Sequence, residues 1–307
     1  MRRRVREDGA DEQVLRVRCS RGRGLAARHE EPEREALPGA AMKHIVFYSG
    51  GKASFLAASR VIEWYGAESV TLLFTDTMVE DTDLYRFLDE SSAALGVPVT
   101  RIADGRTIWQ VFSDSKFLGN NRVPLCSRIL KQEVAQKWVD ANCDPSDTTL
   151  HFGIDWTEEH RMISVRRVWR DWKCESPLLV EPLVEKDAAD ALLKRLGIAQ
   201  PRLYALGASH NNCGGLCVRA GQGAFAWGLK AIPEVYAEWE RNEERLRDQL
   251  GDVAILRDRR GGTSKPLPLV VLRARIANTP EQIDMFDIGG CGCFVEDDED
   301  SPKQEQL

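Results

Sequence analysis

One feature limits the possible folds of this 307-residue chain more than any other. It is a short glycine-containing turn between an apolar run and a helical pattern. Residues 45–48 (I-V-F-Y) are apolar, residues 49–54 read S-G-G-K-A-S, and a helical pattern begins near Phe55. A strand, a turn and a helix N-terminus together present unpaired backbone N–H groups and the positive end of a helix dipole. The turn therefore predicts a site for a phosphate or pyrophosphate group, and hence for a nucleotide.

The residue types in this turn suit an anion. Gly50 and Gly51 let the backbone approach a ligand without a Cβ in the way, Lys52 adds a mobile positive charge, and Ser49 and Ser54 add hydroxyl donors. The spacing matches neither the G-x-x-x-x-G-K-[ST] loop of P-loop NTPases nor the G-x-G-x-x-G loop of dinucleotide sites. Neither class is indicated, and an ordinary tight turn is the alternative interpretation.

Composition narrows the class of protein. The chain is 43% hydrophobic with a formal net charge of −6, and its length suffices for one α/β domain with appendages. No apolar run is long enough to span a bilayer, and the N-terminus carries charges where a signal peptide has an apolar core. We therefore expect a soluble, cytoplasmic protein without a membrane partner. The negative charge gives no support for tight nucleic-acid binding.

Strand-like and helix-like segments alternate from residue 43 to about residue 154. The expected strands are 45–48, 70–75, 97–102 and 148–154. The first expected helix ends at residue 65, and the later ones cover 83–95, 107–113, 127–142, 158–170, 188–196 and 234–250. This rhythm predicts right-handed crossovers and a Rossmann-like, doubly wound, mostly parallel α/β sheet flanked by helices. Ligands of such sheets lie beyond the carboxyl ends of the strands, where Ser49, Asp76 and Asp155 fall.

The chain divides into four parts by composition. Residues 1–41 contain no aromatic residue and no steady apolar period, which predicts a disordered leader or a non-native extension, with an arginine-rich nucleic-acid arm as the alternative. Residues 42–222 form the expected nucleotide-binding domain. Residues 223–295 form a smaller, mainly helical C-terminal extension, and the acidic residues 296–307 are expected to be a disordered tail.

Polar residues follow the second predicted strand, at Asp76, Thr77 and Glu80. In the second position of a doubly wound sheet, a carboxylate or a backbone edge often meets a ribose or an adenine. Capping of the next helix by Asp81 or Asp83 is the alternative.

Cys126 stands at the start of a basic helix, with Arg128 and Lys131 just beyond it. The helix dipole and the two cations draw this thiol toward its thiolate form, and the same cations suit a phosphate. A small buried core residue is the ordinary alternative.

Two further cysteines, Cys213 and Cys217, are separated by three residues, two of which are glycine. A backbone that folds so tightly lets both sulfurs converge on one metal or cluster. Eight cysteines without a secretion signal favour metal or redox use over disulfides. A second close pair, Cys291 and Cys293, lies far downstream and is awkwardly spaced for chelation. An iron–sulfur cluster, zinc and a pair of inert buried thiols all stay open.

Residues 153–161 combine the end of a strand with the start of a helix that carries acidic and basic side chains. Arg161, together with Arg166, could grip phosphate or sulfate oxygens in a bidentate fashion. A solvated helix face is the alternative.

The order of these segments resembles one family, the phosphoadenosine phosphosulfate (PAPS) reductase-like branch of the adenine nucleotide α-hydrolases, also called PP-loop ATP pyrophosphatases. Residues 49–54 resemble its S-G-G-x-D-S loop, 76–80 its D-T…E stretch, 126–131 its cysteine–arginine–lysine helix, and 153–161 its G-I-R-x-x-E-S-x-R segment. Residues 181–217 resemble the run P-L…G-[IL]-P…L-Y-x-x-G…C-x-x-C that closes the family's domain. The resemblance covers about residues 43–222.

The resemblance implies a set of site residues. It implies nucleotide contacts by Ser49, Gly50, Gly51, Lys52, Ser54, Asp76, Thr77, Gly153 and Arg161. It implies catalytic roles for Lys52, Cys126, Arg128, Lys131, Cys291 and Cys293, and metal ligation by Cys126, Cys213 and Cys217. The implied cofactors are ATP or PAPS, Mg²⁺ and a [4Fe–4S] cluster. The implied partners are a sulfur donor or a thioredoxin-like reductant, with nucleic acid only as a modified substrate.

The departures from the family pattern bear on the reaction. Ala53 replaces the aspartate of the loop, which removes a carboxylate that helps to place metal or pyrophosphate. Cys126 stands alone where cluster-bearing members have a pair, so three cysteines would leave one iron open to a substrate sulfur or hydrosulfide unless Cys291 or Cys293 is the fourth ligand. Residues 290–294 lack the glutamate and histidine of the reductases' nucleophile motif.

Three functions follow from the resemblance. The leading one is an enzyme of sulfur chemistry that cleaves ATP to AMP and pyrophosphate, adenylating a second substrate so that sulfur can displace AMP. The alternative is reduction of PAPS or adenylyl sulfate, with Cys291 or Cys293 attacking sulfur and Arg128, Lys131 and Arg161 holding sulfate oxygens. The third is an inactive nucleotide-binding module, marked by Ala53.

Overall fold

The structure is a computed structural model that describes residues 42–185, 187–279 and 287. The predicted leader 1–41, the predicted tail 296–307, and Cys291 and Cys293 lie outside the described residues. Within the described ranges, no helix combines the length and the apolar character needed to cross a membrane.

Five parallel strands form the central sheet. They are β1 (Lys43–Phe47), β2 (Val70–Asp76), β3 (Val99–Ala103), β4 (Thr148–His151) and β5 (Lys173–Glu175), in the spatial order β3-β2-β1-β4-β5. The predicted Rossmann-like, doubly wound sheet is confirmed. The strand β5 was not predicted, because a three-residue edge strand is too short to show a period.

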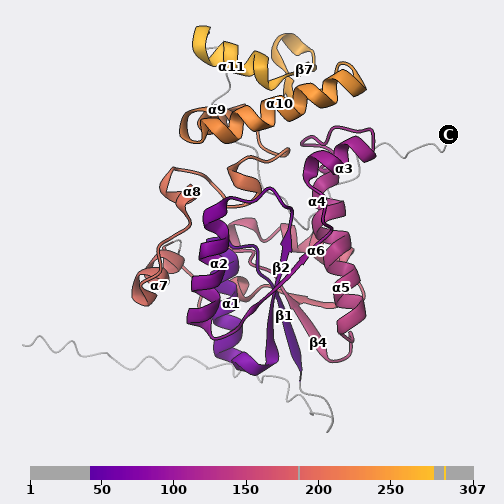
Figure 1. The fold of residues 1–307 in the computed structure, drawn as a ribbon. Helices are drawn as coiled ribbons and strands as arrows, with labels where there is room; N and C mark the ends of the chain where they lie inside the picture. The colour runs from indigo at the N-terminus through magenta and orange to yellow at the C-terminus, as the bar shows by residue number, and fades with distance from the viewer. Residues whose placement is uncertain (1–41, 186, 280–286, 288–307) are drawn as a thin grey trace, which may run out of the picture. The chain divides into compact units, whose positions relative to one another are not determined.

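Helices cover both faces of this sheet (Figure 1). On one face lie α1 (Lys52–Tyr65), α2 (Thr82–Leu95) and α7 (Ala188–Leu196), and on the other lie α5 (Val134–Asn142) and α6 (Arg161–Val168). Successive side chains of β1 alternate between these layers: Val46 and Tyr48 join the core of the first face, and Ile45 and Phe47 join the second. Burial on both faces explains the uninterrupted apolar run that precedes the turn.

The helix predicted over 127–142 is interrupted. It consists of α4 (Leu125–Ser127), a π-helical turn (Arg128–Glu133) and α5. Such turns occur mostly as single irregularities within α-helices, often at functional sites. This one carries Lys131, whose side chain is buried rather than solvated.

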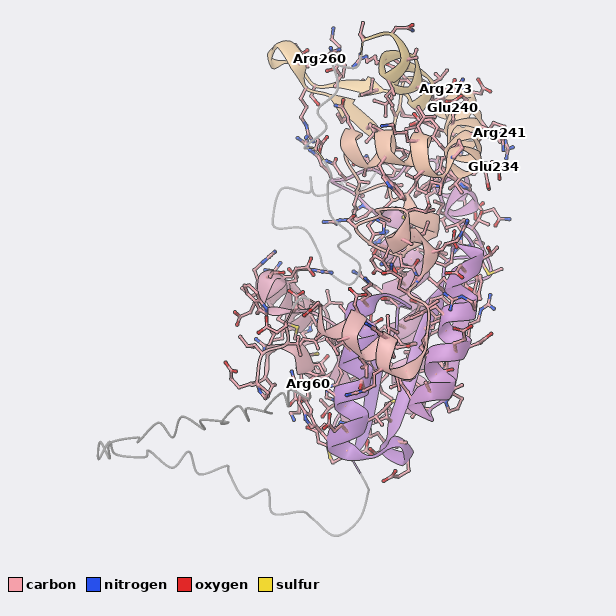
Figure 2. All side chains as sticks on the ribbon, turned by 90° about the vertical axis from the view of Figure 1, so that its left-hand side faces the viewer. Arg60, Glu234, Glu240, Arg241, Arg260 and Arg273 are labelled. Atoms are coloured by element: carbon pink, nitrogen blue, oxygen red, sulfur yellow. The ribbon has the colours of Figure 1, made fainter. Side chains whose placement is uncertain are left out.

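The C-terminal extension is mainly helical, as predicted. It comprises α9 (Gln222–Ala231), α10 (Pro233–Leu250), the hairpin of β6 (Leu256–Asp258) and β7 (Lys265–Leu267), and α11 (Leu269–Asn278). Its core is continuous with α3 (Ile108–Asp114), and Phe112, Leu216, Phe225 and Trp239 all belong to one buried cluster. Figure 2 shows Glu240 and Arg273, whose 2.8 Å ion pair joins α10 to α11.

Short helical turns complete the described elements. They are α8 (Arg202–Ala205) and the 3₁₀ turns Ala67–Ser69, Trp156–Glu158, Pro177–Leu179, Cys213–Gly215 and Arg260–Gly262. Arg60 of α1, labelled in Figure 2, donates to the carbonyls of Pro177, Val180 and Pro182, and so fixes the chain between β5 and α7 against α1.

A buried carboxylate holds the extension together. Glu243 of α10 is fully buried and accepts hydrogen bonds from the backbone N–H groups of Ile255 at 2.9 Å and Leu269 at 2.5 Å. Burial raises the pKa of Glu243 to about 7, against the opposing effect of these two hydrogen bonds. One side chain thereby links α10 to the segments on either side of the hairpin.

Candidate nucleotide site at the carboxyl end of the sheet

The predicted phosphate loop connects β1 to α1 at the carboxyl end of β1. Because β2 and β4 flank β1 on opposite sides, this end of β1 is the point at which strand order reverses, where ligands of doubly wound sheets bind. Gly50 has a φ of 74°, a left-handed conformation that favours glycine. Gly51 is the N-cap of α1 in extended conformation, and it has no side chain with which to cap the helix. The first turn of α1 therefore offers N–H donors to an anion.

Two hydroxyl groups and a neighbouring glycine shape this loop. The Ser54 hydroxyl donates to the carbonyl oxygen of Gly51 at 2.9 Å, and the Ser49 hydroxyl donates to Ser54 at 3.2 Å. A Cβ at Gly153 would lie 2.8 Å from the backbone nitrogen of Ser54, so the chain after β4 can touch α1 only with glycine at this position. Gly153 thus contacts the loop itself.

Two distant side chains reach Lys52. Its Nζ lies 2.6 Å from Oδ1 of Asp190 in α7 and 4.8 Å from the ring centroid of Tyr204 in α8. The backbone N–H of Lys52 also donates to the Tyr204 hydroxyl at 3.4 Å. Asp190 belongs to no sequence motif and was not predicted, and Tyr204 falls within the L-Y-x-x-G stretch without a predicted role of its own.

The start of α2 anchors the segment that carries Tyr204. The Arg202 guanidinium donates to both carboxylate oxygens of Asp81, at 2.8 and 2.6 Å, and the Arg202 backbone N–H donates to Asp83 at 2.7 Å. The hydrogen bond from Arg86 lowers the pKa of Asp83. Asp81 also caps α2 by accepting from the Asp83 N–H at 2.9 Å, which confirms the capping interpretation for Asp81.

Asn211 supports the loop from the other side. Its side-chain nitrogen donates to the carbonyl oxygen of Gly50 at 2.9 Å, and the residue is 1% exposed. Its Oδ1 is buried and has no hydrogen-bond partner among the described residues. An unsatisfied buried acceptor costs about 1–3 kcal/mol, so a donor on a bound ligand or its water would be favoured there.

The end of β2 is occupied by internal bonds. Asp76 is fully buried, forms an ion pair with Arg101, and accepts hydrogen bonds from the Tyr85 hydroxyl at 2.9 Å and the Met78 N–H at 2.7 Å. The bond to Asp76 accompanies a left-handed φ of 62° at Met78. The Asp76 carboxylate is thus engaged within the fold, which leaves the backbone edge of this turn for the predicted nucleoside contact.

Glu80 organises a second buried cluster beside β2. Its carboxylate accepts from the Thr77 hydroxyl at 2.8 Å and from the Cys213 N–H at 2.5 Å, and Lys131 Nζ lies 3.9 Å away. A cavity of about 20 Å³ at the ends of β1 and β2 is lined in part by Ser49 and Lys131. Ser49 of the loop and Lys131, the partner of Glu80, therefore line the same small cavity.

The predicted metal ligands are only partly brought together. Cys213 and Cys217 share a side-chain hydrogen bond, and this bond and burial raise the pKa of Cys213. Cys126 is buried in the same core cluster as Cys217, and all three are free of disulfides. Within the described part of the chain, no three His, Cys, Asp or Glu side chains are arranged to hold a metal ion. Metal ligation by Cys126, Cys213 and Cys217 stays a prediction.

Arg128 lies in the π-helical turn that leads into α5, and Arg161 lies in α6 on the same side of the sheet as α5. Arg128 is exposed, with its Nε 3.9 Å from Glu133, and Arg161 is the first residue of α6, with its Nη1 2.6 Å from Glu158. The helix predicted to begin at 158 begins three residues later, since a 3₁₀ turn capped by Asp155 precedes it.

Comparison with known proteins finds similarity to solved structures alone. No protein-family description matches this chain, and no curated protein matches it. Among solved structures, it is similar to the crystal structure of PAPS reductase from Candida auris in complex with phosphate. The similarity covers 56% of this chain and 80% of that chain, at 12% sequence identity and a TM-score of 0.37.

Proposed function

We propose that this chain is an adenine-nucleotide-dependent enzyme of sulfur chemistry that cleaves ATP to AMP and pyrophosphate. One observation carries the proposal: the loop of residues 49–54 places a helix N-terminus that has no N-cap side chain, and the ammonium of Lys52, at the strand-order reversal of a parallel sheet. A polyphosphate matches this donor set because its oxygens accept backbone N–H bonds and pair with a cation. The sulfur chemistry rests on the sequence resemblance and on the adjoining thiols of Cys213 and Cys217.

The reaction has two balanced steps. An oxygen of the second substrate attacks the α-phosphorus of ATP, pyrophosphate leaves, and an adenylate forms. Hydrosulfide or another sulfur nucleophile then attacks the activated atom and expels AMP, which takes the bonding electrons with its oxygen. Lys52 and the first N–H groups of α1 would hold the phosphates and neutralise the departing pyrophosphate. Mg²⁺, when bound, would add Lewis-acid stabilisation of the same charge.

The [4Fe–4S] cluster stays a prediction, and the proposed steps do not pass through it. Iron and acid-labile sulfide analysis of protein purified without air tests it directly. A cluster held by Cys213 would give about four irons per chain in the parent and a clear loss in Cys213→Ser. Cys143→Ser is the matched control, because Cys143 was not predicted to be a ligand and lies at the end of α5.

ATP binding and turnover test the proposed function. We expect the parent to bind ATP and, with its acceptor, to release AMP and pyrophosphate in equal amounts, and we expect Lys52→Ala to bind ATP about 10- to 100-fold more weakly. Lys194→Ala is the control, since Lys194 is an exposed lysine on α7. Sulfite release from PAPS or adenylyl sulfate with a dithiol, without ATP consumption, would favour the reductase. Binding without turnover of either kind would favour the inactive module, and absence of binding would contradict all three.

A further inference from the structure

The phosphate loop contains no acidic residue, yet the fold brings a carboxylate to it. Ala53 occupies the position where the resembled loops have aspartate. Asp190, from a helix remote in sequence, places its Oδ1 2.6 Å from Lys52 Nζ. The carboxylate therefore lies beside the only lysine of the loop.

We infer that Asp190 supplies the carboxylate that the loop lacks, by an exchange of partners. In the free protein it pairs with Lys52. When a Mg²⁺–nucleotide complex binds, Lys52 turns to the phosphate oxygens and Asp190 becomes a ligand of the metal or of its water. The inference rests on the proposed nucleotide function and assigns a metal-binding residue to that site.

The exposure of the pair makes the exchange feasible. The side chains of Lys52 and Asp190 are 23% and 48% exposed. Ion pairs in such positions contribute only about 0–1 kcal/mol, because water competes for both charges. A bound phosphate, which carries more charge and accepts several hydrogen bonds, can displace the carboxylate at this small cost.

The oxygen atoms at the loop suit Mg²⁺. This ion prefers oxygen ligands, keeps several waters, and is commonly held by one or two carboxylates together with substrate phosphates. One aspartate beside the phosphate loop is therefore enough. The buried, unpartnered Oδ1 of Asn211, whose nitrogen binds the Gly50 carbonyl, offers an acceptor for a donor such as metal-bound water.

The helix that carries Asp190 is fixed against the loop's own helix. Leu192 and Leu193 of α7 are buried in the cluster that contains Phe55 and Val61 of α1. Asp190 is thus presented by a packed element, and its carboxylate stays near the loop after Lys52 releases it.

Calorimetric binding of ATP, with and without Mg²⁺, tests the exchange. In the parent, Mg²⁺ should increase ATP affinity. Asp190→Asn should bind metal-free ATP up to about fivefold more tightly, because Lys52 is released from an exposed pair. The Mg²⁺ enhancement should fall by about tenfold with the loss of one carboxylate ligand. Asp187→Asn is the matched control, because it removes the same charge from the N-cap of α7, where no side-chain cap bond is lost.

The possible outcomes separate this inference from the proposed function. An unchanged Mg²⁺ enhancement in Asp190→Asn would overturn the inference, even if metal-free ATP bound more tightly. Equal shifts in Asp190→Asn and Asp187→Asn would also overturn it, because net charge alone would then explain them. A parent that bound no ATP under either condition would contradict the proposed function instead.

Discussion

Two lysine–carboxylate pairs at the carboxyl end of the sheet differ in depth. Lys52 and Asp190 are 2.6 Å apart and partly exposed, whereas Lys131 and Glu80 are 3.9 Å apart with side chains only 5% and 1% exposed. The longer pair is the harder to break, because its charges have no access to water once separated. We therefore expect the burial of an ion pair, more than its length, to decide whether its partners can exchange for a ligand, as inferred for Lys52 and Asp190, or hold the fold together, as Lys131 and Glu80 do.

The surroundings of the two carboxylates strengthen this contrast. Glu80 also accepts hydrogen bonds from Thr77 and from the backbone of Cys213, so it joins the end of β2 to the cysteine turn. No comparable second bond to Asp190 is recorded among the described contacts. Lys131 has a structural role in this arrangement, and its catalytic role stays a prediction.

Removal of the buried carboxylate of Glu80 should have the largest effect on stability. Glu80→Ala leaves Lys131 buried without its carboxylate and should lower the free energy of unfolding by about 3–5 kcal/mol, measured by urea denaturation. Glu90→Ala is the control, because Glu90 pairs with Arg86 at the surface of α2. Equal losses in the two variants would show that burial does not separate the pairs.

A third carboxylate extends the comparison, because Glu243 is buried without a lysine partner among its recorded bonds. Burial raises its pKa from 4.5 to about 7, so the folded protein binds this proton more tightly than the unfolded chain. Its contribution to stability is complete below pH 4.5 and is lost as the pH rises toward 7, by up to about 3 kcal/mol.

Glu243→Gln should remove this pH dependence, since glutamine does not titrate. Unfolding free energies at intervals from pH 4 to 8 would measure the difference between variant and parent. A difference that stayed constant over that window would contradict the buried, titrating carboxylate.

Loss of the partly exposed ammonium of Lys52 should weaken ATP binding more than it lowers the stability of the fold. Lys52→Ala removes a charged donor to phosphate, an interaction of about 1.5–3 kcal/mol, and should weaken ATP binding by about 10- to 100-fold. Titration calorimetry would measure it, with Lys194→Ala as the control. A Lys52→Ala protein that bound ATP as tightly as the parent would show that the loop is an ordinary turn.

The smallest effect should be on stability at the exposed pair. Lys52→Ala and Asp190→Asn should each change the free energy of unfolding by about 1 kcal/mol or less, and added salt should reduce even this difference. Thermal or urea denaturation at low and high salt would measure it. A loss as large as that of Glu80→Ala would show that Lys52 and Asp190 form a structural pair.

Local patterns revealed the elements with a strong period of their own. Strands β1 to β4, the loop and the long α10 were predicted, because apolar spacing and turn residues indicate them. The edge strand β5 is too short to show a period, and the π-helical turn around Lys131 preserves a helix-like pattern.

The long-range contacts of the site could not be predicted in the same way. Asp190, Tyr204 and Asn211 reach the loop only through packing of segments distant in sequence, as Arg101 reaches Asp76 across neighbouring strands. No local spacing encodes such meetings. The close spacing of Cys213 and Cys217 did predict that their side chains meet, whereas no local spacing relates either residue to Cys126.

The missing side chain at Gly153 controls more than its own turn. A Cβ there would lie 2.8 Å from the backbone nitrogen of Ser54, so the chain after β4 and the first turn of α1 can pack this closely only while residue 153 is glycine. The segment that follows a neighbouring strand thus contacts the start of α1 directly. A bulkier residue at this position would push against the backbone of the predicted phosphate loop, although every residue of the loop itself would be unchanged.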